Sequence, residues 1–540
     1  MADWSNEAKI ILASRYLKKD KLGKVIESYD EMLERVAKHV SSAEKNEEDK
    51  KLWYSKFMSI MDTLEFLPNS PTLMNAGREL GQLSACFVVP VEDSLVHIFE
   101  MVKQVALIHK TGGGTGIILS HIRPANSMVR STSGVASGPV SFMRAFDVAT
   151  DVVKQGGVRR GANIGILKCD HPDIKEFIMC KEDTSKFQNF NISVAITTEF
   201  LESLSNRNKF FLRNPYTKER IPEESSELFN LICHEAWLTG EPGLIFLDNI
   251  NAKNPTPWLG TMEGCNPCGE SPLYPYESCN LGSIDVSKLV KDHKVDWDRL
   301  NEIVEIAVRF LDNIIDINNY PNIKIARKTK LTRKIGLGIM GWADMLIDMG
   351  IRYDSDKAIK LAKRLMMNIR ETAHITSKEL GEEKGPFEGS RGHNKVRRRN
   401  ACLTTIAPTG TLSLLAGCSS GIEPIFGRQF TKTVLGNVKL DLGKKYESVD
   451  SNLLVTAHEI TVEKHIEMQA AFQSYTDNAV SKTINLQNSA TEEEIKKAFL
   501  LAHELGCKGV TAYREGSRAA PIEITVEGEL SECENWRCQI

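Results

Sequence analysis

Asn266, Cys268 and Glu270 are the residues of this chain whose types and spacing are best suited to chemistry. In an extended segment the side chains at i, i+2 and i+4 project to one face, so an amide, a thiol and a carboxylate would lie together. Pro267 has no backbone N–H to donate and Gly269 permits unusual dihedral angles, so we predict a loop or finger rather than a regular strand. This set favours a redox or radical thiol site; the alternative is a loop whose cysteines are simply buried.

Three further segments have compositions that could bind phosphate. Residues 112–116 (Gly-Gly-Gly-Thr-Gly) could expose N–H groups to an anion, although a tight turn explains them as well. Residues 154–163 join glycines to two arginines, which suits a mobile loop that reads a phosphate or a base, or else a solvated basic loop. Residues 407–413 place hydroxyls where a helix is expected to begin, which is typical of a phosphate cradle or of an ordinary N-cap.

Two other patterns carry less weight. Residues 336–341 (Gly-Leu-Gly-Ile-Met-Gly) formally match the dinucleotide-binding fingerprint, but Arg333 and Lys334 precede them where a buried strand is required. We therefore predict helix packing through these glycines, and a nicotinamide-dependent dehydrogenase would rest on this pattern alone. Cys265 and Cys268 form a C-x-x-C pair, but no second pair at suitable spacing completes a zinc site, so we expect no metal ligands.

The composition places the chain among ordinary globular proteins. Its 540 residues are 41% hydrophobic and 26% charged, which argues against a disordered chain. The formal net charge of −3 gives no basic field for nucleic acid, and no apolar run reaches the roughly 18 residues that cross a bilayer. No secretory signal is visible, so the 12 cysteines indicate reduced, buried or catalytic thiols. We predict a cytoplasmic enzyme that binds neither nucleic acid nor membrane.

The order of the expected elements indicates an α/β fold. Residues 5–60 have apolar positions at helical spacing and no proline. From about residue 68 to 515, strand-like runs alternate with helical stretches, which indicates largely parallel strands. The clearest strands are 86–89, 116–119 and 243–247, and the clearest helices are 97–109, 225–238, 298–318, 356–384 and 491–505.

Six segments, in their order along the chain, resemble the large catalytic subunit of ribonucleotide reductase, most closely its adenosylcobalamin-dependent class II form. They are residues 67–77, 82–87, 134–140, 266–270, 407–411 and 419–424. The resemblance covers residues 66–518 and implies a ten-stranded α/β barrel, built from two five-stranded parallel halves, with a central finger loop that carries the key cysteine. It divides the chain into a helical region without an ATP cone (1–62), the barrel (63–518) and a flexible redox tail (519–540).

The resemblance also implies catalytic roles. Cys268 would become a thiyl radical and abstract the 3′-hydrogen of the ribose, Glu270 would act as general base on the 3′-hydroxyl, and Asn266 would orient the substrate. Cys86 and Cys279 would supply two electrons and a proton as the 2′-hydroxyl leaves as water, and would end as a disulfide. The ordinary chemistry of thiols and carboxylates agrees with these roles.

Nucleotide-binding residues follow from the same resemblance. Those expected at the substrate are Ser70, Ala85, Cys86, Gly114, Pro408, Thr409, Gly410, Thr411 and Leu412, with the last five at its phosphates. Those expected at a nucleotide effector, a deoxyribonucleoside triphosphate or ATP, are Asp93, Ser94, Lys110, Arg123 and Arg130. Gly156, Gly157, Arg159 and Arg160 belong to the loop expected to couple the effector to substrate choice.

The tail pair Cys533 and Cys538 resembles the shuttle dithiol of the family, which thioredoxin or glutaredoxin would reduce. The segment around Tyr513 has one tyrosine, whereas class I enzymes relay a radical through an adjacent pair, so class II and adenosylcobalamin are expected. The alternatives are a class I large subunit with a separate radical-generating partner and a catalytically silent nucleotide-binding paralogue. A homodimer is expected, and the choice between diphosphates and triphosphates stays open.

Overall fold

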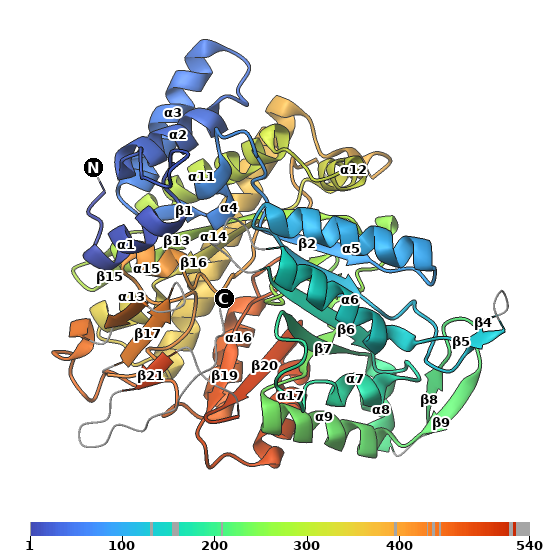
Figure 1. The fold of residues 1–540 in the computed structure, drawn as a ribbon. Coiled ribbons are helices and arrows are strands. Elements are labelled where there is room, and N and C mark those ends of the chain that lie inside the picture. The colour runs from blue at the N-terminus through green and yellow to red at the C-terminus, as the bar shows by residue number, and fades with distance from the viewer. Residues whose placement is uncertain are drawn as a thin grey trace. The chain divides into compact units, whose positions relative to one another are not determined.

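The computed structural model describes residues 2–129, 133–153, 161–206, 209–393, 397–428, 430–434, 438–441, 444–517 and 522–524. The chain forms two compact units, and each is assembled from separated stretches of sequence (Figure 1). The first unit contains Met1–Ala85, Ser278–Lys482 and the described part of Ala519–Ile540. The second contains Cys86–Glu277 and Thr483–Arg518.

Five parallel strands form the centre of the second unit. They pair side by side in the order β2 (Cys86–Pro90), β3 (Gly114–Ile118), β6 (Asn163–Lys168), β7 (Phe190–Ile196) and β10 (Gly243–Phe246). β20 (Gly509–Arg514) pairs antiparallel with β10, and β19 (Thr483–Leu486) pairs parallel with β20. The predicted strands at 86–89, 116–119 and 243–247 are confirmed as β2, β3 and β10.

Helices link the strands of the second unit, as parallel neighbours require. They are α5 (Leu95–Lys110), α6 (Gly138–Val152), α7 (Ile174–Met179), α8 (Thr198–Asn206), α9 (Ser225–Thr239), α10 (Leu247–Ala252) and α17 (Glu492–Glu504). The helices predicted at 97–109, 225–238 and 491–505 are confirmed. Short antiparallel pairs complete the unit: β4 (Met128–Val129) with β5 (Gly134–Val135), β8 (Phe210–Arg213) with β9 (Arg220–Glu223), and β11 (Gly264–Cys265) with β12 (Pro272–Leu273).

β13 (Ser278–Asp285) is the central strand of the first unit. β1 (Phe66–Pro68) pairs antiparallel with it and β16 (Ile335–Met340) pairs parallel. Single parallel bridges from Leu337 to Thr404 and from Ile406 to Val480 extend the same direction of pairing. Smaller antiparallel groups are β14 (Val290–Lys291) with β15 (Lys294–Val295), and β17 (Phe430–Val434) with β18 (Val438–Asp441) and β21 (Ile522–Ile524).

The helices of the first unit enclose a large apolar core. They are α1 (Asn6–Arg15), α2 (Tyr29–Ser41), α3 (Glu47–Asp62), α4 (Ser70–Asn75), α11 (Trp297–Ile317), α12 (Ile323–Thr332), α13 (Trp342–Asp348), α14 (Asp356–Lys384), α15 (Leu412–Ala416) and α16 (Val462–Gln473). α11 and α14 confirm the helices predicted at 298–318 and 356–384. Phe310 of α11 packs edge-on against Phe66 of β1, with ring centroids 5.4 Å apart.

The helical region predicted for residues 5–60 is confirmed, and it consists of the three helices α1, α2 and α3. Gly23, at a positive φ of 81°, lies in the turn between α1 and α2, where Lys19 and Val25 form a bridge. α2 begins at a capping box in which Ser28 and Glu31 satisfy each other's backbone N–H groups. Capping and turn residues therefore end the helical pattern twice, although the apolar spacing continues across the breaks.

Residues 336–341 do not form the helix predicted for them, because they belong to the buried strand β16 and the turn after it. Arg333, just before the strand, is buried with partners: its guanidinium contacts Asp312 at 2.8 Å and Asp316 at 2.7 Å. A side chain at Gly338 would collide with the backbone of Thr405. The glycines thus allow close strand packing, and nothing in their arrangement supports a dinucleotide site.

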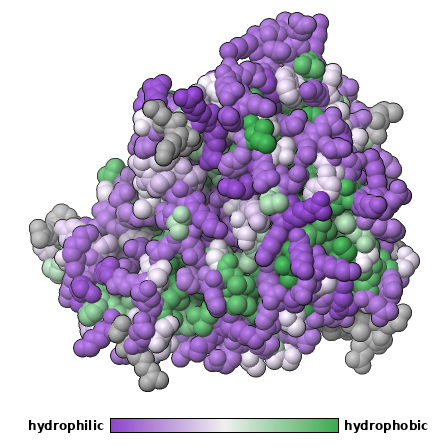
Figure 2. Space-filling model, turned by 180° about the vertical axis from the view of Figure 1, so that it is seen from behind, coloured by the Kyte–Doolittle hydropathy of each residue, from purple (hydrophilic) through white to green (hydrophobic). Residues whose placement is uncertain are grey.

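The surface carries mostly polar side chains. The face drawn in Figure 2 is largely hydrophilic, with hydrophobic residues in scattered groups. Among the described helices, none combines the length and the apolarity that crossing a bilayer demands.

Candidate active site

Residues 266–271 form a loop at the end of a short hairpin, as the proline and glycine predicted. β11 leads into the loop and β12 leads out of it. The amide of Gly269 donates to the carbonyl of Asn266 at 3.0 Å, which closes a turn with Pro267 at its second position. Gly269 has a φ of 80°, a conformation that favours glycine. Cys268 therefore lies at the tip of a defined turn.

The turn separates the Cys268 side chain from those of Asn266 and Glu270, which an extended segment would have placed on the same face. Cys268 is exposed, whereas Asn266 and Glu270 are 1% and 2% exposed. Asn266 Nδ2 donates to the sulfur of Cys86 at 3.1 Å, and Asn266 Oδ1 accepts from the amide of Ser271 at 2.8 Å. The structure thus brings Asn266 and Cys86 into direct contact and presents Cys268 outward.

Glycines on β3 allow the finger hairpin to cross the sheet at close range. A Cβ at Gly116 would overlap the carbonyl oxygen of Cys265, and one at Gly114 would lie 3.1 Å from Pro267 Cγ. Gly114 is also the register partner of Cys86 on the neighbouring strand. Two glycines of the run at 112–116 therefore admit the finger: Gly116 the backbone of Cys265, and Gly114 the ring of Pro267.

Two contacts that the sequence did not reveal hold the finger in place. Asn191 Nδ2 on β7 donates to the carbonyl of Pro267 at 3.2 Å. Cys265 is fully buried in a small core with Met262 and Tyr274, and this burial raises the pKa of its thiol. A lone asparagine in a strand carries no local signal of such a role, and the sequence pointed to Cys265 only as a member of a C-x-x-C pair. Cys265 is a packing residue of the finger.

Replacing Gly116 by alanine is expected to displace the finger or destabilise the fold by about 1–3 kcal/mol, because the new Cβ meets backbone that cannot rotate away. Gly165→Ala on the adjacent strand β6 is the matched control, since its Cβ would meet side chains alone: the flexible Met143 at 3.2 Å and Phe177 at 3.5 Å. Thermal unfolding of both variants measures the difference. Equal melting temperatures would show that the crossing does not depend on a missing side chain.

Glu270 is a buried carboxyl group with an unusual proton affinity. Burial raises its pKa to about 7, against a partial lowering by the hydrogen bond from Asn266. Its Oε2 atom has no hydrogen-bond partner among the residues that the structure describes. A carboxyl group that titrates near neutrality and keeps one oxygen unoccupied is well suited to accept a proton from a bound molecule.

Glu270→Gln should stabilise the protein at pH 8 and leave its stability unchanged near pH 4. The raised folded-state pKa means that the stability linked to the protonated carboxyl is fully present below the unfolded value of about 4.5 and is lost as pH rises through about 7. The neutral amide avoids that loss. Denaturant unfolding at both pH values gives the comparison, with Glu227→Gln as an exposed control. A gain of the same size at both pH values would contradict the assignment.

In the first unit, Cys279 and two expected substrate residues are firmly placed. Cys279 lies on β13 and is fully buried. The amide of Ala85 donates to the carbonyl of Cys279 at 3.1 Å. Ser70, the first residue of α4, has its hydroxyl 2.7 Å from that of Tyr16.

The expected phosphate segment 408–412 is a loop that leads into α15. Thr409 is 6% exposed and has a φ of 55°, an uncommon conformation for a β-branched residue. Its Oγ1 accepts from the amide of Gly421 at 2.7 Å, and its carbonyl accepts from the amide of Ser413 at 2.8 Å. The segments 407–413 and 419–424, which the sequence singled out separately, therefore pack together.

The described residues expected at the effector do not form one cluster. Arg123 Nε lies 2.7 Å from Asp93 Oδ2, and its guanidinium stacks over Tyr216. Ser94 caps the start of α5, whereas Lys110 ends this helix of 16 residues. A rise of about 1.5 Å per residue puts the backbone of Lys110 roughly 24 Å from that of Ser94.

Several expected residues lie outside the described part of the chain: Arg130, Gly156, Gly157, Arg159, Arg160, Cys533 and Cys538. Among the residues that are described, no group of His, Cys, Asp or Glu side chains could hold a metal ion.

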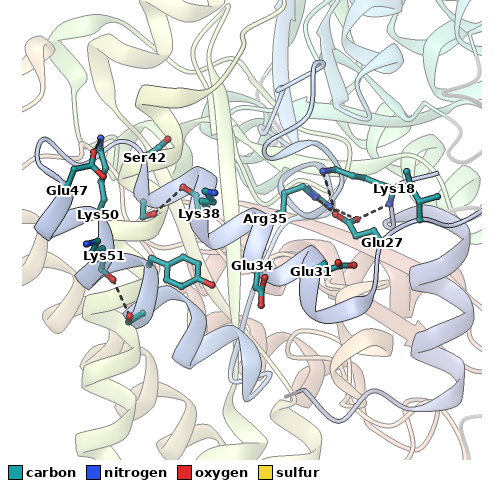
Figure 3. Close-up of a pocket in the computed structure, with 14 residues that line it drawn as sticks. Lys18, Glu27, Glu31, Glu34, Arg35, Lys38, Ser42, Glu47, Lys50 and Lys51 are labelled. Atoms are coloured by element: carbon teal, nitrogen blue, oxygen red, sulfur yellow. Dashed lines mark hydrogen bonds and ion pairs between the residues drawn. The ribbon is translucent and has the colours of Figure 1, made fainter. Parts of the chain in front are cut away.

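A cavity of about 860 Å³ lies in the N-terminal helices, and none of its lining residues is an expected site residue (Figure 3). Its charged groups largely satisfy one another: Arg35 pairs with Glu27 at 2.6 Å, and Lys50 pairs with Glu47 at 2.7 Å. This pairing gives the cavity no clear preference for a charged ligand.

Comparisons with known proteins give consistent matches along the chain. Family models match the ribonucleotide reductase barrel domain over residues 84–399 and 393–513, and the ribonucleotide reductase all-alpha domain over residues 5–81. These matches confirm the expected fold class, an α/β barrel domain preceded by a helical region.

Three relatives illustrate the similarity. A vitamin B12-dependent ribonucleoside-diphosphate reductase of Thermoplasma acidophilum is 49% identical over 87% of this chain and 66% of its own length. One of Mycobacterium tuberculosis is 43% identical over 95% of this chain and 79% of its own. A vitamin B12-dependent ribonucleotide reductase of Streptomyces coelicolor is 28% identical over 98% of this chain and 68% of its own. The chain thus spans about two thirds to four fifths of the lengths of these relatives.

Proposed function

Because the chain belongs to the ribonucleotide reductase large-subunit family, we propose that it reduces ribonucleotides to 2′-deoxyribonucleotides by the class II, adenosylcobalamin-dependent route. The observation that carries this proposal is the finger loop: an exposed thiol at Cys268, a buried base at Glu270 and an amide at Asn266 bonded to the sulfur of Cys86. The names of the relatives support the cofactor and the substrate class.

The residues of the finger would divide the reaction between them. Cys268, as a thiyl radical, takes the 3′-hydrogen of the ribose. Glu270 accepts the proton of the 3′-hydroxyl, a task for which its pKa of about 7 is appropriate. Asn266, whose Oδ1 is held by the amide of Ser271, offers a fixed amide to the substrate.

The reduction itself requires two thiols. Loss of the 2′-hydroxyl as water and gain of hydrogen at that carbon consume two electrons and two protons, which Cys86 and Cys279 supply as they become a disulfide. Both thiols are buried, which protects radical intermediates from water. In this proposal Cys533 and Cys538 return the disulfide to dithiol and are themselves reduced by thioredoxin or glutaredoxin, which places the enzyme in the reducing cytoplasm.

Bound adenosylcobalamin supplies the one-electron oxidation that a cysteine thiol needs to become a radical. The exposure of Cys268 fits this requirement, because a hydrogen atom can leave only from a thiol that the cofactor can reach. A class I enzyme would instead deliver the radical through adjacent tyrosines, and the segment Thr511-Ala512-Tyr513-Arg514 has only one.

The test is an assay of the purified protein with a ribonucleotide, dithiothreitol and adenosylcobalamin, without a second subunit. Deoxyribonucleotide should form, Cys268→Ala should abolish its formation, and Cys180→Ala should retain it. Equal melting temperatures of the two variants show that the loss is chemical. If the wild-type protein forms no product alone but forms it once a radical-generating subunit is added, class I would be favoured instead.

We also propose that the enzyme forms a homodimer through α5 and α6. Leu95, Val96 and Phe99 on α5 are 63%, 83% and 56% exposed, and Val148 and Val152 on α6 are 63% and 76% exposed. α5 and α6 pack against each other, and the apolar positions recur at helical spacing. An apolar face of two adjacent helices is typical of a subunit contact. Such a contact would add a partner's residues to the effector site.

Val96→Glu combined with Val152→Glu should convert the dimer to a monomer, because a charge in an apolar interface loses its hydration without gaining a partner. Light scattering after gel filtration measures the mass. Ile375→Glu, at a residue of α14 that is 60% exposed, is the control and should leave the mass unchanged. A wild-type monomer at micromolar concentration would contradict the proposal.

A further inference from the structure

Asp344 of α13 hydrogen-bonds to the turn at residues 419–421, which packs against the segment 408–412. Its carboxylate accepts a hydrogen bond from the amide of Ser419, and its own amide donates to the Ser419 hydroxyl at 3.4 Å. The amide of Gly341, just before α13, donates to the carbonyl of Ser419 at 2.8 Å. The start of α13 is thereby fastened to the turn at residues 419–421 through both side chain and backbone.

The other carboxylate oxygen of Asp344 binds a third segment, residues 445–446. Tyr446 donates its hydroxyl to Oδ1 at 2.9 Å, and Lys445 Nζ lies 2.9 Å from the same atom. The Asp344 side chain is 13% exposed and Tyr446 is buried, so the bond between them forms largely away from water, whereas the Lys445 side chain is 43% exposed and its ion pair is partly solvated. One carboxylate therefore accepts from donors on two separate loops.

The turn at 419–421 in turn fixes the conformation of Thr409. The amide of Gly421 donates to Thr409 Oγ1 at 2.7 Å, and the hydroxyls of Ser420 and Ser413 lie 2.9 Å apart. Gly421 also packs against the carbonyl of Ala407, where a Cβ would come within 2.9 Å. A positive φ at a threonine costs of the order of 1–3 kcal/mol and persists only where neighbouring contacts impose it.

The C-terminal end of residues 419–424 is anchored as well. Tyr353 donates its hydroxyl to the carbonyl of Ile422 at 2.6 Å, and Lys482 Nζ lies 2.8 Å from Glu423 Oε2. Residues 419–424 are thus anchored at both ends, so a loss at Asp344 acts on a turn that has little freedom to adapt elsewhere.

From these contacts we infer that Asp344 is a positioning residue for substrate phosphate. It acts through Ser419 and Gly421 on Thr409, and so sets the backbone of the segment 408–412 that receives the phosphates of the nucleotide. The inference rests on the function proposed above, which assigns the phosphates to that segment. Asp344 itself touches neither the substrate nor the reacting atoms.

Asp344→Asn should weaken binding of ADP about tenfold and leave binding of adenosine within about twofold. The amide has one accepting oxygen, so it cannot accept hydrogen bonds from both loops, and the bonds to one of them are lost. In turnover, KM for the ribonucleotide should rise by a similar factor while kcat changes less than about threefold. Asp348→Asn is the matched control: it lies on the same helix, is exposed, and its carboxylate accepts no hydrogen bond among the described residues. It should behave as wild type.

Equilibrium dialysis with ADP and with adenosine separates the outcomes. Unchanged ADP affinity in Asp344→Asn, or equal losses for ADP and adenosine, would overturn the positioning role. If the asparagine variant does not fold, Tyr446→Phe removes one donor to the same carboxylate and should weaken ADP about threefold. A wild-type protein that binds ADP but reduces no ribonucleotide would overturn the proposed reaction alone, since the binding comparison still holds.

Discussion

The passage of the finger hairpin across β3, without a side chain between the two backbones, is the constraint on which the rest of the site depends. The carbonyl of Cys265 occupies the space where a Cβ of residue 116 would stand. Because the hairpin lies directly on the sheet, Asn266 reaches the sulfur of Cys86, and Pro267 reaches both Gly114 and Asn191. A hairpin raised by the thickness of one methyl group would lose these contacts together, since each depends on the same separation.

The same closeness accounts for the electrostatics of the loop. Glu270 is buried at the base of the loop, and this burial is the main cause of its raised pKa. Cys268 is exposed because the turn at residues 266–269 places it at the tip of the finger hairpin. Two neighbouring residues thus acquire opposite environments, one buried and the other exposed, from a single change in chain direction.

The sequence predicted much of this arrangement where a local rule applied. Alternating apolar runs and helical spacing located β2, β3, β10 and the long helices, and Pro267 with Gly269 identified the finger as a loop. The error at residues 336–341 has a physical cause: Arg333 suggests exposure, but in the fold its charge pairs with Asp312 and Asp316 of α11, which lie 21 and 17 residues earlier. The purpose of Gly116 and the anchoring by Asn191 likewise depend on contacts between segments that are far apart in sequence, which no local pattern records.

The way in which the chain is divided between its two units also has a consequence for synthesis. Leu244 of β10 pairs with Val510 of β20, so the second unit is completed by a strand that leaves the ribosome long after β10 does. Until then β10 presents an unpaired edge, and contacts of such long sequence separation form slowly. A chain that stalls or is cut before residue 509 would carry an intact finger segment on an unfinished sheet, a species more prone to aggregation than to catalysis.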